Sequence, residues 1–286
     1  MRWVSQEHLL IIRANRMSLM FLTGYPRGLS RCLCFKIRRL NDHIVELAND
    51  NIGHPIFYVI GDIHGEVDRL VALHTKINNY HLNVFSTHRK IIIHLGDYVD
   101  RGHDSYAVIE WIMERSELMD AQSEIINLKG NHEDMMVKAF LSDNPSSYNF
   151  WIKNGGVQTI ESYAWRDLSR PPKTHLDWMQ HLKSYYWNKK EKIICVHAGI
   201  DQNTFPNDGQ TIHLWKRTDH LQHMINPVRE DLKDTIIIHG HTPTETCQPD
   251  ISTNRLVVNV DTGACFDGDL TSAIVRHGEL LGFLST

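Results

Sequence analysis

Residues 56–65 read Ile-Phe-Tyr-Val-Ile-Gly-Asp-Ile-His-Gly, five residues of strand character followed at once by a turn with an acid and a histidine. The same order returns in residues 90–102, where Lys-Ile-Ile-Ile-His-Leu precedes Gly-Asp-Tyr-Val-Asp-Arg-Gly. A third run, residues 124–128, precedes Lys-Gly-Asn-His-Glu. Short runs rich in β-branched and aromatic residues predict buried strands, and the glycine beyond each run predicts a sharp turn.

Helix-length segments separate these predicted strands. Apolar residues recur at helical spacing over residues 67–77 and 108–113. Further strand-like runs are 192–196, 235–238, 256–260, 271–276 and 280–284. Strands that alternate with helices predict an α/β fold. Residues 141–190 contain three prolines, many aromatic residues and few strand-like runs. We interpret them as a mainly helical insertion that forms a cap over the ends of the predicted strands.

The first 54 residues differ from the rest in charge. Residues 1–40 carry eight Lys or Arg and one acidic residue, whereas the remainder carries 22 basic and 33 acidic residues. The His54-Pro55 step marks a boundary, because the residue before a proline is disfavoured in a helix. We therefore predict a basic N-terminal extension, residues 1–54, and a single α/β domain, residues 55–286. The extension is interpreted as a solvated segment or the product of an upstream start codon, with contact to membrane or nucleic acid as the alternative.

Composition restricts the class of protein. The acidic balance of the domain disfavours nonspecific nucleic-acid binding, and no run approaches the ~18 apolar residues that a membrane span needs. The five cysteines are odd in number and lack zinc-finger spacing, so free thiols in a reducing cytosol are expected. Several of the 19 histidines, among them His81, His88 and His175, stand in polar surroundings and are expected to be solvated. We predict a cytoplasmic protein without a membrane span, of undetermined oligomeric state.

Metal-ligating residue types follow five of the predicted strands. They are Asp62, His64, Asp97, Asn131, His197 and His241. Ligands of α/β sheets bind outside the carboxyl ends of strands, so these turns are expected to converge on one crevice. Carboxylate, imidazole and amide oxygen favour Mn, Fe, Zn or Mg. Six ligands suit two ions about 3.5–4 Å apart that share one carboxylate and lower the pKa of a water between them toward ~7.

The set of turns resembles the phosphoprotein phosphatase branch of the calcineurin-like metallophosphoesterases. The match is carried by Gly61-Asp-Ile-His-Gly65, Gly96-Asp-Tyr-Val-Asp-Arg-Gly102, Gly130-Asn-His-Glu133, His197-Ala-Gly199 and Gly240-His-Thr242. The Asp261-Thr-Gly263 turn and the Leu214-Trp-Lys-Arg217 stretch are similar to small bacterial and phage-type serine/threonine protein phosphatases. The resemblance implies a four-layer α/β/β/α sandwich with a helical cap.

The resemblance also implies roles for the metal-ligating residues. Asp62 and His64 would hold the first metal, Asp97 would bridge, and the second metal would be held by Asn131, His197 and His241. Manganese is the favoured ion, with Fe, Zn, Ni or Mg as alternatives. A second histidine after His241, common in other branches, is replaced by Pro243, so the first metal would have fewer protein ligands. His239 is interpreted as a strand histidine and not as a ligand.

Four further residues complete the implied active site. His132 would act as the general acid, oriented by Asp100, because a nearby carboxylate raises the pKa of an imidazole and fixes its tautomer. Arg101 and Arg217 would bind phosphate oxygens through the guanidinium fork. Arg229 is close to Arg217 in sequence and is the competing candidate.

These roles predict a phosphomonoester hydrolase that uses a metal-bound hydroxide, with phosphoserine or phosphothreonine in protein as the first substrate class. The alternatives are a symmetrical diadenosine tetraphosphatase or another small-molecule phosphoesterase, and a non-catalytic phosphate-binding scaffold. A scaffold predicts a damaged ligand set, whereas the sequence keeps every expected ligand and His132. Aromatic residues of the cap are interpreted mainly as its own core, with stacking on a substrate as the alternative.

Overall fold

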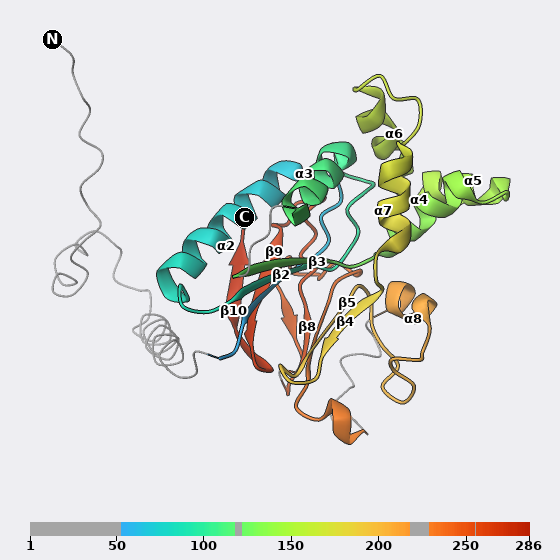
Figure 1. Cartoon of the computed structure of the whole chain (residues 1–286). Coiled ribbons are helices and arrows are strands. Elements are labelled where there is room, and N and C mark those ends of the chain that lie inside the picture. The colour runs from blue at the N-terminus through green and yellow to red at the C-terminus, as the bar shows by residue number, and fades with distance from the viewer. Residues whose placement is uncertain (1–52, 118–121, 218–228, 255) are drawn as a thin grey trace, which may run out of the picture. The chain divides into compact units, whose positions relative to one another are not determined.

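Two five-stranded sheets form the centre of the fold in the computed structural model (Figure 1). The structure describes residues 53–117, 122–217, 229–254 and 256–286, so almost all of the predicted N-terminal extension lies outside the described residues. The first sheet has the order β10-β9-β1-β2-β3. Its strands are β1 Ile56–Ile60, β2 Lys90–His94, β3 Ser123–Asn127, β9 Thr271–Arg276 and β10 Glu279–Ser285.

The second sheet has the order β4-β5-β6-β8-β7. Its strands are β4 Tyr185–Asn188, β5 Ile193–Val196, β6 Ile236–His239, β7 Asp250–Ile251 and β8 Val257–Asn259. In each sheet three neighbouring strands run parallel, β1-β2-β3 in the first and β5-β6-β8 in the second. Parallel strands turn all their carboxyl ends toward one edge of the sheet.

The core lies between the two sheets. Phe57 and Val59 of β1 pack there in one buried cluster with Cys195 of β5 and Ile238 of β6. The intervening residue Tyr58 points the other way and hydrogen-bonds His81 of a covering helix. This alternation is the period of two that a strand imposes on its side chains. The second sheet therefore buries the inner face of the first.

Helices cover the outer faces unequally. α2 Val67–Val84 and α3 Ser105–Glu117 lie along the first sheet (Figure 1). The outer face of the second sheet is covered by Phe205 and Leu232, from the segments around the short α8 Gln210–Trp215 and η3 Glu230–Leu232. Two sheets flanked by helices confirm the predicted α/β sandwich, with a thin fourth layer.

The cap is helical over most of its predicted length. It consists of α5 Pro145–Trp151, the widened turn η1 Ile152–Gly156, α6 Val157–Ala164 and α7 Lys173–His181, and α4 Asn131–Leu141 leads into it. The prediction is wrong at its end, because residues 185–188 form β4 and pair antiparallel with β5. Tyr-Tyr-Trp-Asn is a sequence of high strand propensity, and an available sheet edge satisfies its backbone groups. None of the described helices is both long and apolar enough to cross a membrane.

Three of the histidines expected to be solvated are instead buried, and two others, His220 and His223, lie outside the described residues. His81, His88 and His175 are 6%, 3% and 1% exposed. His175 Nδ1 lies 2.7 Å from the hydroxyl of Tyr163, and its Nε2 lies 2.6 Å from a carboxylate oxygen of Glu110. The polar neighbours of His175 in sequence did not indicate its exposure, because its partner Glu110 comes from α3, 65 residues away.

Candidate metal centre

The strand ends meet because neighbouring strands stop level with one another. Ile60 of β1 is opposite His94 of β2, and His94 is opposite Asn127 of β3. The turns that follow touch, and this contact requires glycine. A Cβ on Gly96 would lie 2.3 Å from the backbone nitrogen of Gly130, and one on Gly130 would lie 2.1 Å from Asp97 Oδ1. The predicted convergence of the first three turns is therefore a matter of backbone contact.

Several residues of the centre have left-handed backbone conformations. They are His64, Asp97, Asp100, Arg101 and His241, with φ of 44°, 52°, 74°, 66° and 72°. A left-handed conformation costs a non-glycine residue roughly 1–2 kcal/mol. Such strain persists where the surrounding structure holds it, and it is concentrated at functional sites. Here it aims successive side chains of each turn into the same space.

One group of donor atoms has the spacing of a metal shell. Asn131 Oδ1 lies 2.8 Å from His197 Nε2 and 3.0 Å from His241 Nδ1, and the two imidazole nitrogens are 3.2 Å apart. Asp97 Oδ1 lies 3.4 Å from His197 Nε2. Ligands at about 2.0–2.2 Å from a common ion lie about 3 Å from one another. These residues could hold one divalent ion.

A second group shares Asp97 with the first. The other carboxylate oxygen, Asp97 Oδ2, lies 3.4 Å from His64 Nε2 and 3.9 Å from His132 Nε2. One carboxylate thus presents one oxygen to each group, which is the geometry that a bridging ligand requires. Together the two groups fit a pair of divalent ions of the hard to borderline class.

Asp62 lies at the margin of this arrangement. Both of its carboxylate oxygens accept from the backbone N–H of His241, at 3.1 and 3.0 Å. Asp62 Oδ1 is 3.9 Å from His197 Nδ1. A residue without an assigned role, Asp261, is 3% exposed and lies beside it, where the two carboxylates interact. The structure therefore brings Asp62 to the centre but shows its carboxylate held by protein.

Burial determines the electrostatics of the centre. It raises the pKa of Asp62 and Asp97 well above the usual range, and neighbouring carboxylates add to the effect. Burial likewise lowers the pKa of His64 and His197 far below the usual range, and neighbouring histidines, together with Arg101 in the case of His64, contribute. Carboxylates crowded together and imidazoles kept neutral favour a bound cation, because a cation offsets the repulsion between the carboxylates and binds the neutral form of the imidazoles.

His132 and Asp100 form the predicted pair. His132 Nδ1 lies 2.7 Å from Asp100 Oδ2, and both side chains are buried. Burial, with Arg101 and His241, lowers the pKa of His132. Burial raises the pKa of Asp100 to about 7. The expected rise in the pKa of His132 from its carboxylate is therefore outweighed by desolvation, although the orienting contact is present.

Asp100 is itself held by groups that the motif did not reveal. Trp151 Nε1 donates to both of its carboxylate oxygens at 2.9 Å, and the Thr159 hydroxyl donates to Oδ1 at 2.7 Å. Thr159 Oγ1 also accepts from the backbone N–H of Asp100 at 2.8 Å. Trp151 is fully buried, as expected for a core aromatic of the cap. The cap thus orients Asp100, which sequence spacing of 51 and 59 residues gave no means to predict.

Glu133 is the other residue whose function the sequence did not indicate. Its buried carboxylate accepts from the backbone N–H groups of Asp97, Tyr98 and Gly130, at 2.9, 2.7 and 2.8 Å. It therefore ties the turn after β2 to the turn after β3. Its place in the Gly-Asn-His-Glu motif was a signal, but the partners become visible only in the fold.

The two predicted arginines differ in position. Arg101 Nη1 lies 2.7 Å from His64 Nε2, so its guanidinium enters the centre. Arg217 is exposed, and its charge acts on the pKa of His241. The competing candidate, Arg229, pairs with Asp231 and with the backbone oxygen of Phe205. Arg101 thus contacts His64, the charge of Arg217 acts on His241, and Arg229 is held by other partners.

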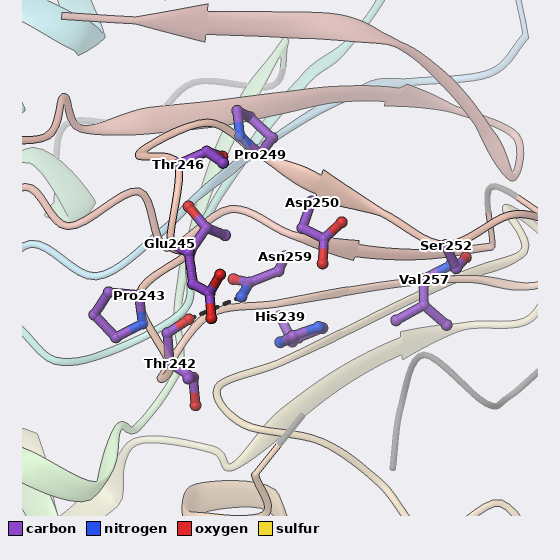
Figure 2. A pocket seen from close by; sticks show the side chains of 11 residues that line it. His239, Thr242, Pro243, Glu245, Thr246, Pro249, Asp250, Ser252, Val257 and Asn259 are labelled. Carbon is purple, nitrogen blue, oxygen red and sulfur yellow. Dashed lines mark hydrogen bonds between the residues drawn. The ribbon is translucent and has the colours of Figure 1, made fainter. Parts of the chain in front are cut away.

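An aromatic face and a cavity adjoin the centre. The ring of Trp215 lies 6.2 Å from the imidazole of His241 at 78°, and the ring of Phe150 lies 6.3 Å from Trp215. A cavity of about 430 Å³ lies on the side of Thr242 and Pro243, with His239 among its lining residues. Figure 2 shows these residues around it. No expected ligand lines it. His239 is a buried strand residue that contacts the backbone oxygen of Gly240, and it stands apart from both ligand groups.

Known proteins with similar sequences or folds are phosphoesterases. The family model of the calcineurin-like phosphoesterases matches residues 56–268, more than half of the chain. The asymmetrical bis(5'-nucleosyl)-tetraphosphatase PrpE of Anoxybacillus flavithermus is 27% identical over 240 residues, 79% of this chain and 91% of the relative. That of Bacillus cereus is 28% identical over 78% of this chain and 90% of its own length.

Solved structures agree on the fold. The crystal structure of a proposed diadenosine tetraphosphatase has a TM-score of 0.55 at 14% identity, over 81% of this chain and 93% of that one. A cold-active protein tyrosine phosphatase has a TM-score of 0.52 at 16% identity, over 82% and 79% of the two chains. At these identities the likeness concerns the fold alone.

Proposed function

The chain belongs to the calcineurin-like phosphoesterase family, and we propose that it hydrolyses phosphate esters or anhydrides with two divalent metal ions. The observation that carries this proposal is Asp97, whose two carboxylate oxygens face the two groups of donor atoms. We assign Asp62 and His64 to one ion, and Asp97 bridges this ion and the second. The remaining ligands of that second ion are Asn131, His197 and His241. When bound, such ions supply an activated water and neutralise phosphate oxygens.

The remaining side chains are proposed to handle the substrate. His132 would hold a proton toward the leaving oxygen, and the contact of its Nδ1 with Asp100 would keep Nε2 directed at the centre. Arg101 would turn from His64 to the phosphate oxygens, since it already reaches the centre. Arg217, exposed near His241, would bind more distal phosphate oxygens.

A dinucleoside tetraphosphate is the substrate class that we propose first. The curated relatives named above are tetraphosphatases, and this chain spans about nine tenths of their length. The aromatic face of Trp215 and Phe150 supports the proposal, because it offers a stacking surface for a base beside His241. Phe150 is 52% exposed, which leaves it available to a ligand.

A phosphoserine or phosphothreonine protein is the second candidate. The observation in its favour is the Gly96-Asp-Tyr-Val-Asp-Arg-Gly102 block, which resembles that of the protein phosphatases. Manganese remains the proposed ion, because carboxylate, amide oxygen and imidazole together suit it. The metal is tested by restoring activity to chelator-treated protein with Mn, Fe, Zn, Ni or Mg in turn.

The first experiment measures hydrolysis of an aryl phosphate by the manganese-loaded protein and its His132→Asn variant. We expect the variant to lose about 100-fold or more in kcat, within the usual contribution of a positioned acid. His181→Asn, which changes an exposed histidine at the end of α7, is the matched control and should retain activity. An inert wild type with every metal, or an equally active His132→Asn, would refute the proposed chemistry.

The second experiment separates the substrates. The same preparation is given diadenosine tetraphosphate and a phosphopeptide, and the products are identified by chromatography. Turnover of the dinucleotide alone would refute the protein phosphatase assignment, and turnover of the peptide alone would refute the nucleotide assignment. Trp215→Leu should raise KM for the dinucleotide about tenfold while leaving aryl phosphate hydrolysis unchanged, because loss of one stacked base costs about 1–3 kcal/mol.

We propose that the basic segment, residues 1–54, is not required for hydrolysis. The predicted ligands all lie in residues 62–241, beyond this segment. Removal of residues 1–50 should therefore leave kcat unchanged. Loss of folded, active protein would make the segment structural.

A further inference from the structure

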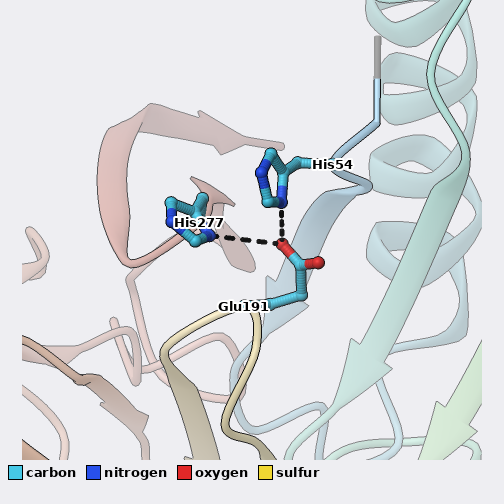
Figure 3. Close-up of side chains that lie close together, drawn as sticks. All are labelled: His54, Glu191 and His277. Atoms are coloured by element: carbon cyan, nitrogen blue, oxygen red, sulfur yellow. Dashed lines mark hydrogen bonds and ion pairs between the residues drawn. The ribbon is translucent and has the colours of Figure 1, made fainter. Parts of the chain in front are cut away.

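A third group of metal-ligating side chains lies away from the proposed active site. His54 Nδ1 is 2.7 Å from Glu191 Oε2, and His277 Nδ1 is 3.7 Å from the same oxygen. The imidazole rings are 4.1 Å apart at 37°, and Figure 3 shows both turned toward one carboxylate oxygen. The three donor atoms all lie within 4.8 Å of one another.

The group contains residues from both sheets and lies at the end of the sheets away from the proposed active site. His54 stands just before β1, and His277 lies in the turn between β9 and β10, so both belong to the first sheet. Glu191 lies in the turn between β4 and β5 of the second sheet. The proposed active site follows the carboxyl ends of β1 and β5, whereas this group precedes their amino ends. At about 3.3 Å per residue, the five residues of β1 alone separate the two by roughly 17 Å.

The donor set is that of a borderline transition metal. Two imidazole nitrogens and one carboxylate oxygen are ligands that zinc accepts, with a water in the fourth position. Tetrahedral ligands at 2.0–2.1 Å from an ion lie about 3.3 Å apart. The contacts of the two imidazole nitrogens with Glu191 Oε2, at 2.7 and 3.7 Å, lie on either side of that value.

Burial and access both favour a bound cation. Glu191 is 3% exposed, and a cation held between its carboxylate and the two imidazoles would offset the cost of burying its charge. His54 and His277 are 21% and 44% exposed, so an ion and its water can enter between them. A cavity of about 310 Å³, lined by His54, Glu191 and Lys190 among others, lies on one side.

The conformation of His277 is a second reason to expect a specific role. It has φ of 45° and precedes Gly278 with φ of 79°, so both residues of the hairpin turn are left-handed. Asn-Gly is the pair that this turn favours. Histidine at the first position is accepted at a conformational cost, and the ring that it supplies points at Glu191 (Figure 3).

We propose that His54, Glu191 and His277 bind one divalent transition-metal ion of the zinc class, which links the two sheets at the end of their strands opposite the catalytic centre. The proposed metal site does not depend on the proposed hydrolytic function. Its two imidazoles are partly open to solvent, and its effect is to hold the hairpin β9–β10 and the start of β1 against the β4–β5 turn.

The test counts ions and does not depend on turnover. Wild type, His277→Asn and Glu191→Gln are dialysed against the same excess of zinc and analysed by elemental mass spectrometry. Asparagine is suited to the left-handed turn, so His277→Asn removes the ligand without disturbing the hairpin. We expect each variant to hold one ion fewer per chain than wild type, with unchanged aryl phosphate hydrolysis. His181→Asn is the control and should hold as many ions as wild type.

A second measurement guards against loss by misfolding. Zinc added to His277→Asn should raise the Tm less than it raises that of wild type, because a ligand stabilises only the fold that binds it. Equal zinc content in wild type and both variants would overturn the proposal, and so would an equal rise in Tm. Loss of hydrolysis with the third ion still bound would concern the catalytic centre alone.

Discussion

Replacing Trp151 with phenylalanine tests whether the cap orients the catalytic pair. The indole N–H of Trp151 donates to both oxygens of Asp100 at 2.9 Å, and Asp100 in turn contacts His132. Phenylalanine keeps the aromatic packing but removes the donor. A hydrogen bond to a charged acceptor contributes about 1.5–3 kcal/mol, and the smaller ring leaves a cavity in a fully buried position. We expect the free energy of unfolding to fall by about 2–4 kcal/mol.

The effect of Trp151→Phe on catalysis depends on the hydrogen-bond donors that still hold Asp100. Thr159 still donates to Asp100 Oδ1 at 2.7 Å, so the carboxylate keeps one of its side-chain donors. If about 1.4 kcal/mol of the lost interaction appears in the transition state, kcat falls about tenfold. KM for an aryl phosphate should not change, because Trp151 is buried behind Asp100 and has no exposed surface for a substrate.

The assay combines urea unfolding with steady-state hydrolysis of an aryl phosphate by the manganese-loaded protein. Trp165→Phe is the matched control, since Trp165 belongs to the same cap but is 62% exposed. It should remain within about 0.5 kcal/mol and twofold of wild type. The reasoning is refuted if Trp151→Phe is as stable and as active as Trp165→Phe. A changed KM with an unchanged kcat would also contradict it, because it would place Trp151 at the substrate.

Other perturbations test other parts of the structure. Asp97→Asn should lower the metal content of the protein by elemental analysis and reduce turnover on the order of 100-fold or more, because one carboxylate serves both groups; an unchanged metal content would contradict the bridging role. Gly156→Ala places a Cβ 2.6 Å from the ring of Trp151 and should cost about 1–3 kcal/mol in unfolding free energy. Gly282→Ala, which has nothing within 4 Å, is its control and should cost less than about 0.5 kcal/mol. Burial lowers the pKa of His94 to about 4 from an ordinary value of 6.5, so the unfolded chain gains a proton as the pH falls below 6.5 while the folded chain does not. The folded state then loses about 2 kcal/mol between pH 7 and pH 5, and His94→Gln should remove that part of the difference between urea titrations at the two pH values.

The ligand types and their order along the chain could be predicted from the sequence. Apolar runs of strand length and the glycines beyond them report local conformation, and local conformation places a ligand at the end of a strand. Five such turns indicated an α/β fold and a metal site with Asp97 in it. The resemblance to phosphoesterases added His132, Asp100 and Arg101, and the structure brings these side chains into contact with one another or with a predicted ligand.

What the sequence could not determine are distances between segments far apart in the chain. Residues 185–188, which lie in the predicted cap, form a strand because β5 offers a free edge to pair with. Trp151 reaches Asp100 through the packing of the cap, and Glu133 reaches the Asp97 turn because β2 and β3 end side by side. His54, Glu191 and His277 are separated by 137 and 86 residues, and only the stacking of two sheets brings them together. The period of apolar residues indicates which face of a helix or strand a residue occupies. The residue that it contacts across that face is determined by the register and packing of the folded chain.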